Sequence, residues 1–420
     1  MILASEMLDK LSSMVKNHHP IRINRIISYA KDVALQRITN ISVPFNKEDL
    51  FKIVHGAVST KICSILKVPM AQIAITAIES INNGMEIDIK NNIKIEKIIG
   101  DLRDTKCLDG LMFMKDIFHP AMRTSIENPK VLLIDFPLEY KKGESATKLS
   151  LLKKDDFTKL LEGEENQIRR AVDQIVSLNP DIVVTEKGIS DIALGLFASK
   201  NITALRRFKK IDAARLARLS GGTTVSRPED LQTRHLGSVG QFSYEFINND
   251  WYCIFHKVKD PKAVTVVISG PSKDINAELE RNLFDALKVA KNVMINPKLV
   301  PGGGASEYAV IAGLREAFAD KDVVHKKVCN LICRALQSIP SILAKNSGAD
   351  NVLELLQKLE NEHLNRNSYM GINGLTGDIC DVRSIIMDPI QVKEQCYKSA
   401  FDIVIQLLRV DGIVECKTKQ

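Results

Sequence analysis

The stretch Val300-Pro301-Gly302-Gly303-Gly304-Ala305-Ser306-Glu307 decides more about this chain than any other. Helical apolar periodicity precedes it over 277–294, and a second helical pattern follows it over 305–318. A run of glycines costs backbone entropy and contributes no side-chain burial, so its use is a tight turn or a close backbone approach. Such loops often hold a ligand, commonly a nucleotide. The triplet is equally consistent with a plain tight turn between two helices.

The composition is that of a folded protein with more than one core. The chain has 420 residues, of which 45% are hydrophobic and 26% charged, and these values favour a globular protein of two or three domains. Aromatic residues make up 5%, with the single tryptophan Trp251, which argues against stacking platforms for single-stranded nucleic acid. The net charge of +7 is small for this length, so we expect no nucleic-acid partner.

The length of the apolar runs and the spacing of the cysteines indicate the cellular compartment. Runs such as 73–78 and 131–134 fall far short of the roughly 18 residues of a membrane span, so we expect no membrane partner. The 8 cysteines include no Cys-x-x-Cys pair, which is typical of reduced thiols in the cytosol. His325, Cys329 and Cys333 share a helix face and could supply soft metal ligands. Apolar neighbours and the lack of an evident fourth ligand favour core packing there instead.

Hydrophobic periodicity predicts helical ends around a mixed centre. Helices are expected over 2–17, 23–34, 47–66, 69–81, 155–178, 189–198, 213–219 and most of 274–408. Strands are expected over 85–98, 131–134, 181–184, 202–205, 223–225 and 263–268. Two loops, 296–304 and 366–389, interrupt the helical C-terminal part. The strand–helix alternation favours an α/β module nested between helical segments, in which the chain leaves a helical base and later returns to it.

The helix expected over 277–294 carries Asp285 on its polar side. Leu279, Leu283 and Leu287 define its apolar face, and at about 100° per residue Asp285 points the opposite way. From the sequence alone this is the pattern of a solvated helix face.

The first residues are already part of an apolar helical repeat. Met1-Ile2-Leu3 has no Ser, Thr, Asp or Asn ahead of it to cap a helix. We therefore expect a chain that has been cut.

Several ordered stretches resemble the group II chaperonins over nearly the whole chain. They are Leu138–Ser145, Thr185–Asp191, Asn201–Arg207, Val225–Leu231, Glu280–Leu283, Leu299–Glu307 and Gly371–Gly377. The block Lys141-Lys142-Gly143-Glu144-Ser145 indicates one particular paralogue among the subunits of TRiC, the eukaryotic cytosolic ring complex. The resemblance implies an α/β multidomain chaperonin with a helical equatorial domain, a small intermediate domain and an α/β apical domain inserted between them.

The resemblance also implies the domain boundaries. The N-terminally truncated equatorial domain would comprise 1–38 and 296–420, and the intermediate domain 39–108 and 256–295. The apical, substrate-facing domain would comprise 109–255.

By the same resemblance the chain carries part of an ATP site. The glycines that lie against the nucleotide would be Gly302, Gly303 and Gly304, and the adenine-side loop would include Asn373 and Gly374. Asp381 matches the acid that contacts the ribose, although from the sequence alone it reads as a polar residue closing a short strand. Asp285 matches the catalytic aspartate that polarises the attacking water.

The sequence departs from the family at its N-terminal end. Ahead of Met1 the family has a Gly-Pro-Lys-Gly type turn, an Asn-Asp-Gly segment and a Gly-Asp-Gly-Thr-Thr loop, whose aspartates hold magnesium, and none of these occurs in the 420 residues. ATP and magnesium are thus implied cofactors, while the magnesium ligands are absent from this sequence. Two alternatives follow: an ATP-dependent chaperonin subunit, or a truncated, non-hydrolysing scaffold or client-binding module.

Partners and compartment follow from the same resemblance. It implies paralogous subunits in a hetero-oligomeric double ring in the cytoplasm, with unfolded client proteins as substrates. The expected substrate-binding residues lie on the helix over 189–198 and are Ile192, Leu194, Leu196 and Phe197. Such an apolar helix usually belongs to a core, but an exposed apolar side would suit client chains.

Overall fold

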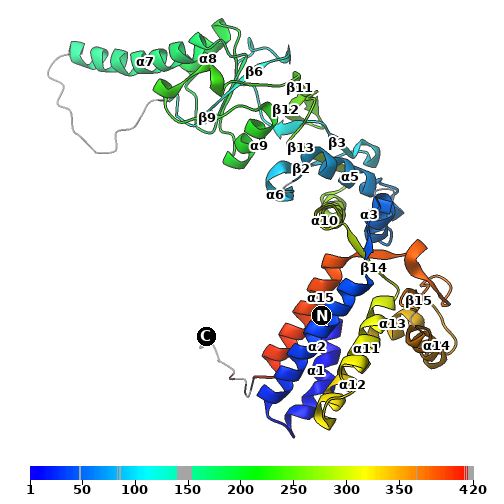
Figure 1. The fold of residues 1–420 in the computed structure, drawn as a ribbon. Helices are drawn as coiled ribbons and strands as arrows, with labels where there is room; N and C mark the ends of the chain where they lie inside the picture. The colour runs from blue at the N-terminus through cyan, green and yellow to red at the C-terminus, as the bar shows by residue number, and fades with distance from the viewer. Residues whose placement is uncertain are drawn as a thin grey trace. The chain divides into compact units, whose positions relative to one another are not determined.

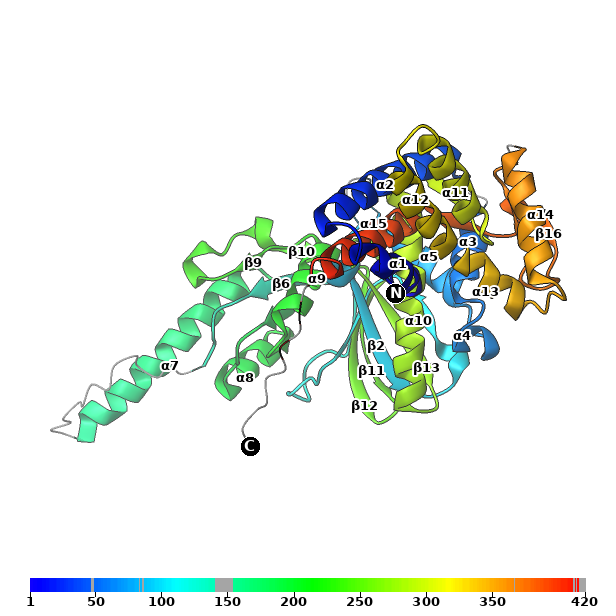
Figure 2. The same ribbon diagram turned by 90° about the horizontal axis from the view of Figure 1, so that it is seen from below.

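The computed structural model describes residues 1–46, 49–82, 84, 87–139, 154–365, 367–410, 412 and 414, without the side chains of 154–161 and 164. The chain forms two compact units, Met1–Ala57 together with Val289–Gln420, and Val58–Lys288. Many of their helices and strands are labelled in Figure 1, and Figure 2 shows the same ribbon from below. The finer division into equatorial, intermediate and apical domains stays a prediction.

The first unit is built around helices whose apolar stripes face one another. The helices are α1 (Ile2–Val15), α2 (Pro20–Ile41), α11 (Ala305–Ala317), α12 (Val323–Leu336), α13 (Ser338–Asn346), α14 (Val352–Leu364) and α15 (Ile390–Leu407). Met7, Ile27, Ile332 and Phe401, from four of these helices, are buried in one core. The predicted helical ends are therefore confirmed. Within the described residues, every helix is too short or too polar to cross a membrane.

The sulfur atoms of α12 lie in this core. Cys329 and Cys333 are both buried, with their Sγ atoms 3.9 Å apart. His325 contacts Asp322 at the start of the helix. The two cysteines pack in the core, as the sequence pattern favoured.

Two small antiparallel sheets close the first unit. The order of the first is β1 (Val43–Pro44), β14 (Lys298–Pro301) and β17 (Met387–Pro389), and the second is the hairpin β15 (Met370–Ile372) with β16 (Ile379–Asp381). The sequence pattern placed β14, β15, β16 and β17 in loops and assigned no element to β1. Each of these strands has at most four residues, too few for a period of two to show, and several contain proline.

The second unit contains the predicted α/β module. Strands β6 (Lys130–Ile134), β7 (Ile182–Thr185) and β8 (Thr203–Leu205) are parallel, β9 (Thr224–Val225) adds in parallel to β6, and β10 (Gly237–Ser238) pairs antiparallel with β6. Helices α7 (Lys154–Ser177) and α8 (Asp191–Ser199) pack on one face through Leu132 and Val183. Helix α9 (Lys210–Ser220) packs on the other face through Leu133 and Val184. Strands β6, β7 and β8 are buried on both sides, which explains their largely apolar sequences.

Two further sheets and a long helix complete the second unit. The sheets are β4 (Leu111–Met114), β12 (Asp250–His256), β11 (Gln241–Ile247) and β5 (Ser125–Glu127) in one, and β2 (Ile93–Ile99), β13 (Val264–Gly270) and β3 (Lys106–Leu108) in the other. The helices outside the α/β module are α4 (Ile62–Ile65), α5 (Met70–Ile81), α6 (Ile89–Asn92) and most of α10 (Lys273–Ile295), whereas α3 (Leu50–Val58) belongs to the first unit except for Val58. The strand expected over 85–98 begins only at Ile93. Asp88 accepts a hydrogen bond from the Asn91 amide and so caps the short helix α6, which precedes the strand.

The glycine triplet is the turn between β14 and α11. Gly303 and Gly304 adopt the left-handed conformation, with φ of 58° and 82°. The Gly302 amide donates to the Ile386 carbonyl at 3.1 Å, and the Ala305 amide donates to the Gly302 carbonyl at 3.0 Å. A Cβ on Gly303 would lie 2.8 Å from the Ile372 carbonyl oxygen, so this position requires glycine for both its φ and its space.

Replacing Gly303 by alanine should therefore destabilise the first unit more than a left-handed φ alone explains. We expect Gly303→Ala to lower the free energy of unfolding by at least about 2 kcal/mol. Gly348→Ala is the matched control, because Gly348 has a φ of 76° and nothing within 4 Å of its Cβ position, and it should cost about 1 kcal/mol. Equal losses in urea unfolding would contradict the close approach between Gly303 and Ile372.

Candidate functional site

The hairpin β15–β16 lies directly against the glycine triplet. The Ile372 amide donates to the Gly303 carbonyl at 2.8 Å. A Cβ on Gly303 would also lie 3.1 Å from Cγ1 of Val382, the residue that follows β16. The structure thus brings the triplet to both ends of the hairpin, although about 70 residues separate them along the chain.

Asn373 and Gly374 begin the loop that joins the two hairpin strands. The Asn373 amide donates to the Asp378 carbonyl and its Oδ1 accepts from the Leu375 amide, at 2.9 and 3.0 Å. Among the described residues other than Gly374 and its two chain neighbours, no atom lies within 4 Å of a Cβ built on Gly374. This loop is therefore open to solvent beside the triplet.

Asp381 is the last residue of β16 and its carboxylate is held by Arg383. Oδ1 accepts from the Arg383 amide at 3.0 Å, and Oδ2 accepts from Arg383 Nε at 2.9 Å. These hydrogen bonds from Arg383 lower the pKa of Asp381 below its usual value. The arginine also lies over the Tyr369 ring, 4.6 Å from its centroid. Asp381 is thus an ionised, half-exposed acceptor on the hairpin that lies against the triplet.

The first turn of α11 contains its own anion. Gly304 caps the helix without a side chain, and Glu307, three residues on, is almost fully buried and accepts from Lys393 Nζ at 2.9 Å. Burial alone would raise the pKa of Glu307, but the charge and hydrogen bond of Lys393 outweigh it and lower the pKa. A carboxylate therefore already balances the positive end of this helix.

These residues fit the nucleoside part of ATP better than its phosphates. The triplet can bring its backbone close to a ligand, and the loop at Asn373 and Gly374 is open. The Asp381 carboxylate can accept a hydrogen bond from a hydroxyl group. The start of α11, the usual kind of phosphate site, is balanced by Glu307. Among the described residues no group of three or more His, Cys, Asp or Glu side chains could hold a metal ion.

Asp285 lies in the second unit, on α10. Its carboxylate pairs with Lys61, which directly precedes α4, and 52% of its side chain is exposed. Leu279 and Leu283 on the opposite face are fully buried, which confirms the predicted polar orientation of Asp285. The sequence pattern gave no sign of Lys61, since a single lysine 224 positions away has no periodicity to reveal it. Catalysis by Asp285 stays a prediction.

The expected client-binding residues divide between the two sides of α8. Leu194 and Phe197 are buried in the core beneath the helix, with 3% and 0% exposed. Ile192 and Leu196 are only partly buried. The division follows the helical period, because 193, 194, 197 and 198 share the inner face. In this structure Leu194 and Phe197 are not accessible to a client chain, and the outer face carries Ile192 and Leu196.

Sequence reasoning missed Glu307, Lys393 and Arg383. A signal existed for two of them, because each charge falls within an apolar helical stripe. Glu307 precedes the buried residues Val310 and Leu314 at helical spacing, and Lys393 lies between Ile390 and Tyr397. Charged residues at such positions are usually paired with each other.

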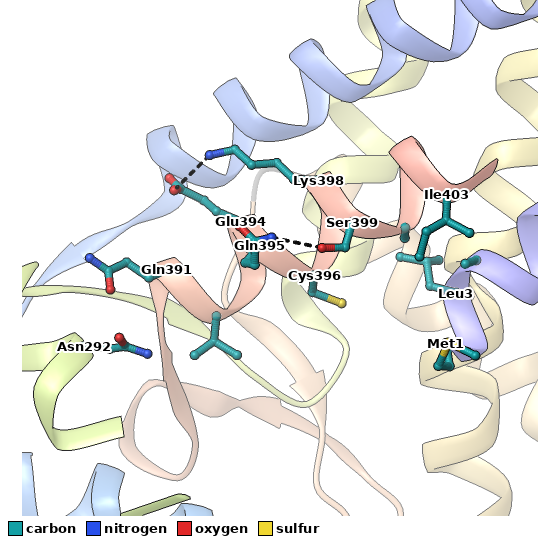
Figure 3. Close-up of a pocket in the computed structure, with 13 residues that line it drawn as sticks. Met1, Leu3, Asn292, Gln391, Glu394, Gln395, Cys396, Lys398, Ser399 and Ile403 are labelled. Atoms are coloured by element: carbon teal, nitrogen blue, oxygen red, sulfur yellow. Dashed lines mark hydrogen bonds and ion pairs between the residues drawn. The ribbon is translucent and has the colours of Figure 1, made fainter. Parts of the chain in front are cut away.

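A hollow of about 690 Å³ lies elsewhere in the first unit, along the start of α1 and one side of α15 (Figure 3). Its lining includes Leu3, Gln391 and Ile403, together with Gln395 and Ser399, which hydrogen-bond to each other at 3.0 Å. None of the expected site residues lines it.

Comparison with known proteins identifies the family. The model of the TCP-1/cpn60 chaperonin family matches residues 1–418. T-complex protein 1 subunit gamma of Encephalitozoon cuniculi is 46% identical over 99% of this chain and 81% of its own length, and that of Bos taurus is 38% identical over 100% and 79%. A solved structure, the open state monomer of a group II chaperonin from Methanococcoides burtonii, is similar with a TM-score of 0.70 and 25% identity, covering 97% of this chain and 98% of its own.

These similarities agree with the paralogue that Lys141–Ser145 indicated, the gamma subunit, although that block lies outside the described residues. They also confirm the predicted fold class, since helical segments and the nested α/β module match a chaperonin monomer along almost its whole length. The chain belongs to the TCP-1/cpn60 chaperonin family.

Proposed function

We propose that this chain is a subunit of an ATP-dependent chaperonin, which joins paralogous subunits in a cytoplasmic double ring and assists the folding of client proteins. The names of its relatives support this role. The observation that carries the nucleotide part is the hydrogen bond between Ile372 and the Gly303 carbonyl, which holds the open loop and Asp381 beside the triplet. This reading is favoured over a non-hydrolysing scaffold, because the similarity to chaperonin subunits extends along the entire chain.

In this proposal the first unit holds the nucleoside of ATP. The backbone of Gly302–Gly304 forms one wall, and the loop at Asn373 and Gly374 receives the base, where no side chain fills the space. Asp381 accepts a hydrogen bond from a ribose hydroxyl with a carboxylate that Arg383 keeps ionised. When bound, ATP supplies the phosphate bond whose hydrolysis drives the cycle.

Asp285 is the proposed residue for activating water. Its carboxylate is half-exposed and pairs only with Lys61 among the contacts described for it. A carboxylate of this kind accepts a hydrogen bond from the attacking water and orients it. It takes the water's proton as the oxygen bonds to the γ-phosphorus and the bond from that phosphorus to ADP breaks. The ion pair with Lys61 holds the carboxylate in place until then.

The outer face of α8 is the proposed client surface. Ile192 and Leu196 lie one turn apart, with Gly195 between them on the same side. Partly exposed apolar side chains on a rigid helix suit the apolar segments that an unfolded chain exposes, without demanding any one sequence.

The ribose contact predicts a loss of selectivity. Asp381→Asn should weaken ADP binding to the full chain about tenfold, the effect of losing one charge-assisted hydrogen bond. The wild-type chain should prefer ADP over 2′,3′-dideoxy-ADP, and the variant should bind both equally in titration calorimetry. Asp378→Asn, an exposed acid in the same hairpin, should leave both affinities unchanged. If the wild-type chain binds no ADP, the nucleotide assignment is wrong.

The role of Asp285 predicts a separation of binding from hydrolysis. Asp285→Asn should reduce the single-turnover rate of ATP hydrolysis by about 100-fold while nucleotide affinity changes less than about twofold. Glu278→Gln is the control, because Glu278 lies on the same helix and pairs only with the exposed Arg281 among its described contacts. A variant that hydrolyses ATP at the wild-type rate would exclude Asp285 as the catalytic base.

The client surface predicts different outcomes for the two sides of α8. Ile192→Ser with Leu196→Ser should reduce capture of a chemically unfolded test protein several-fold, while the melting temperature of the chain changes little. Phe197→Ala should instead destabilise the second unit by about 3–5 kcal/mol, because it leaves a cavity in the core. Unchanged capture by the double variant, measured by suppression of aggregation, would remove α8 from the proposal.

A further inference from the structure

The first unit contains a largely buried ion pair next to the glycine triplet. Glu307 on α11 has 2% of its side chain exposed and Lys393 on α15 has 18%, with 2.9 Å between Oε1 and Nζ. Taking two charges out of water is expensive, and apolar residues of similar size often serve stability as well or better. An ion pair in this position therefore calls for a reason other than the stability of the fold.

The pair is part of a set of contacts that joins the segment before the triplet to the helix after it. Lys393 Nζ also lies 3.6 Å from the Asp388 carboxylate on β17. Asp388 is the register partner of Val300 on β14, the strand that leads into the triplet. One ammonium group thus ties the segment before the glycines to Glu307, the third residue of the helix after them. The triplet spans the short distance between these two anchors.

The surroundings keep both groups charged and fixed. Ser306 Oγ donates to Glu307 Oε2 at 3.0 Å, which leaves little freedom for the carboxylate to rotate. Tyr397 is buried on α15 one turn after Lys393. The charges of Glu307 and Asp388 raise the pKa of Lys393 although its burial would lower it. Both partners therefore stay ionised at neutral pH.

We propose that Lys393, bound to Glu307 and Asp388, is a positioning residue that sets the backbone of Gly302–Gly304 in the conformation that receives a nucleotide. This inference rests on the proposed nucleotide site and extends it to residues that do not touch the ligand. Glycines have no side chains to hold them, so their left-handed conformation at 303 and 304 must be imposed by their neighbours. The ion pair is such a constraint, because it fixes both ends of the turn through one atom.

The experiment compares three variants of the full chain: Glu307→Gln, Lys393→Met, and the two combined. Each single variant leaves one buried charge without its partner and should lower the melting temperature. The double variant removes both charges and should regain stability. If the pair positions the triplet, ADP affinity stays about tenfold or more below wild type in the double variant. If the pair only stabilises the fold, affinity returns together with stability, and the inference is overturned.

Amide hydrogen exchange without any ligand provides the second readout. In the double variant the amides of Gly302, Ala305 and Ile372, whose hydrogen bonds define the turn, should exchange about tenfold faster than in the wild-type chain. Amides in α12 should be unaffected. Unchanged exchange at the turn would overturn the positioning role, whether or not the chain binds ADP. Failure of the wild-type chain to bind ADP, with faster exchange in the variant, would instead contradict the nucleotide proposal alone.

Lys31→Met is the matched control. Lys31 on α2 pairs with Asp402 on α15 at 2.9 Å and is about as exposed as Lys393, at 24% of its side chain. Its loss also removes an ion pair to α15, but at Asp402, about two and a half turns further along the helix than Lys393. It should leave ADP affinity and exchange at the turn unchanged. An effect equal to that of the double variant would mean that any loosening of α15 disturbs the triplet, which would exclude a specific role for Lys393.

Discussion

The close approach of Gly303 to the β15–β16 hairpin is the constraint on which the candidate site depends. The Ile372 amide reaches the Gly303 carbonyl at 2.8 Å, and no side chain would fit between the two backbones. Because the contact is backbone to backbone, it fixes the loop at Asn373 and the end of β16 in one step. Without it, the triplet, the open loop and Asp381 would be three unrelated surface features.

Charge within the first unit reinforces this arrangement. The start of α11 would ordinarily attract a phosphate, but Glu307 supplies the negative charge from within the chain and Lys393 neutralises it. The start of α11 therefore exposes backbone groups to a ligand, while its positive helix-dipole end is already balanced by Glu307. This favours the uncharged part of a nucleotide at the triplet. Surface pairs such as Lys358 with Glu354 on α14 have no comparable effect, since solvent screens them.

Periodicity in the sequence predicted what depends on one segment at a time. It placed Leu279 and Leu283 inside and Asp285 outside on α10, and the structure agrees, because a single helix fixes these directions. It gave the parallel strands of the α/β module for the same reason. It could not separate Ile192 from Phe197 on α8, since all four expected residues are apolar. Which of them faces solvent is decided by the sheet beneath the helix.

The sequence by itself determined that a glycine turn lies between two helical patterns, that a nested α/β module interrupts helical segments, and that the chain resembles chaperonins. Only the tertiary structure decided what lies against the turn. The partner of Gly303 is at 372, that of Glu307 at 393 and that of Lys61 at 285. Local patterns carry no record of such pairings, because they arise from packing between distant segments, where a single charge or carbonyl finds its partner only once the core has formed.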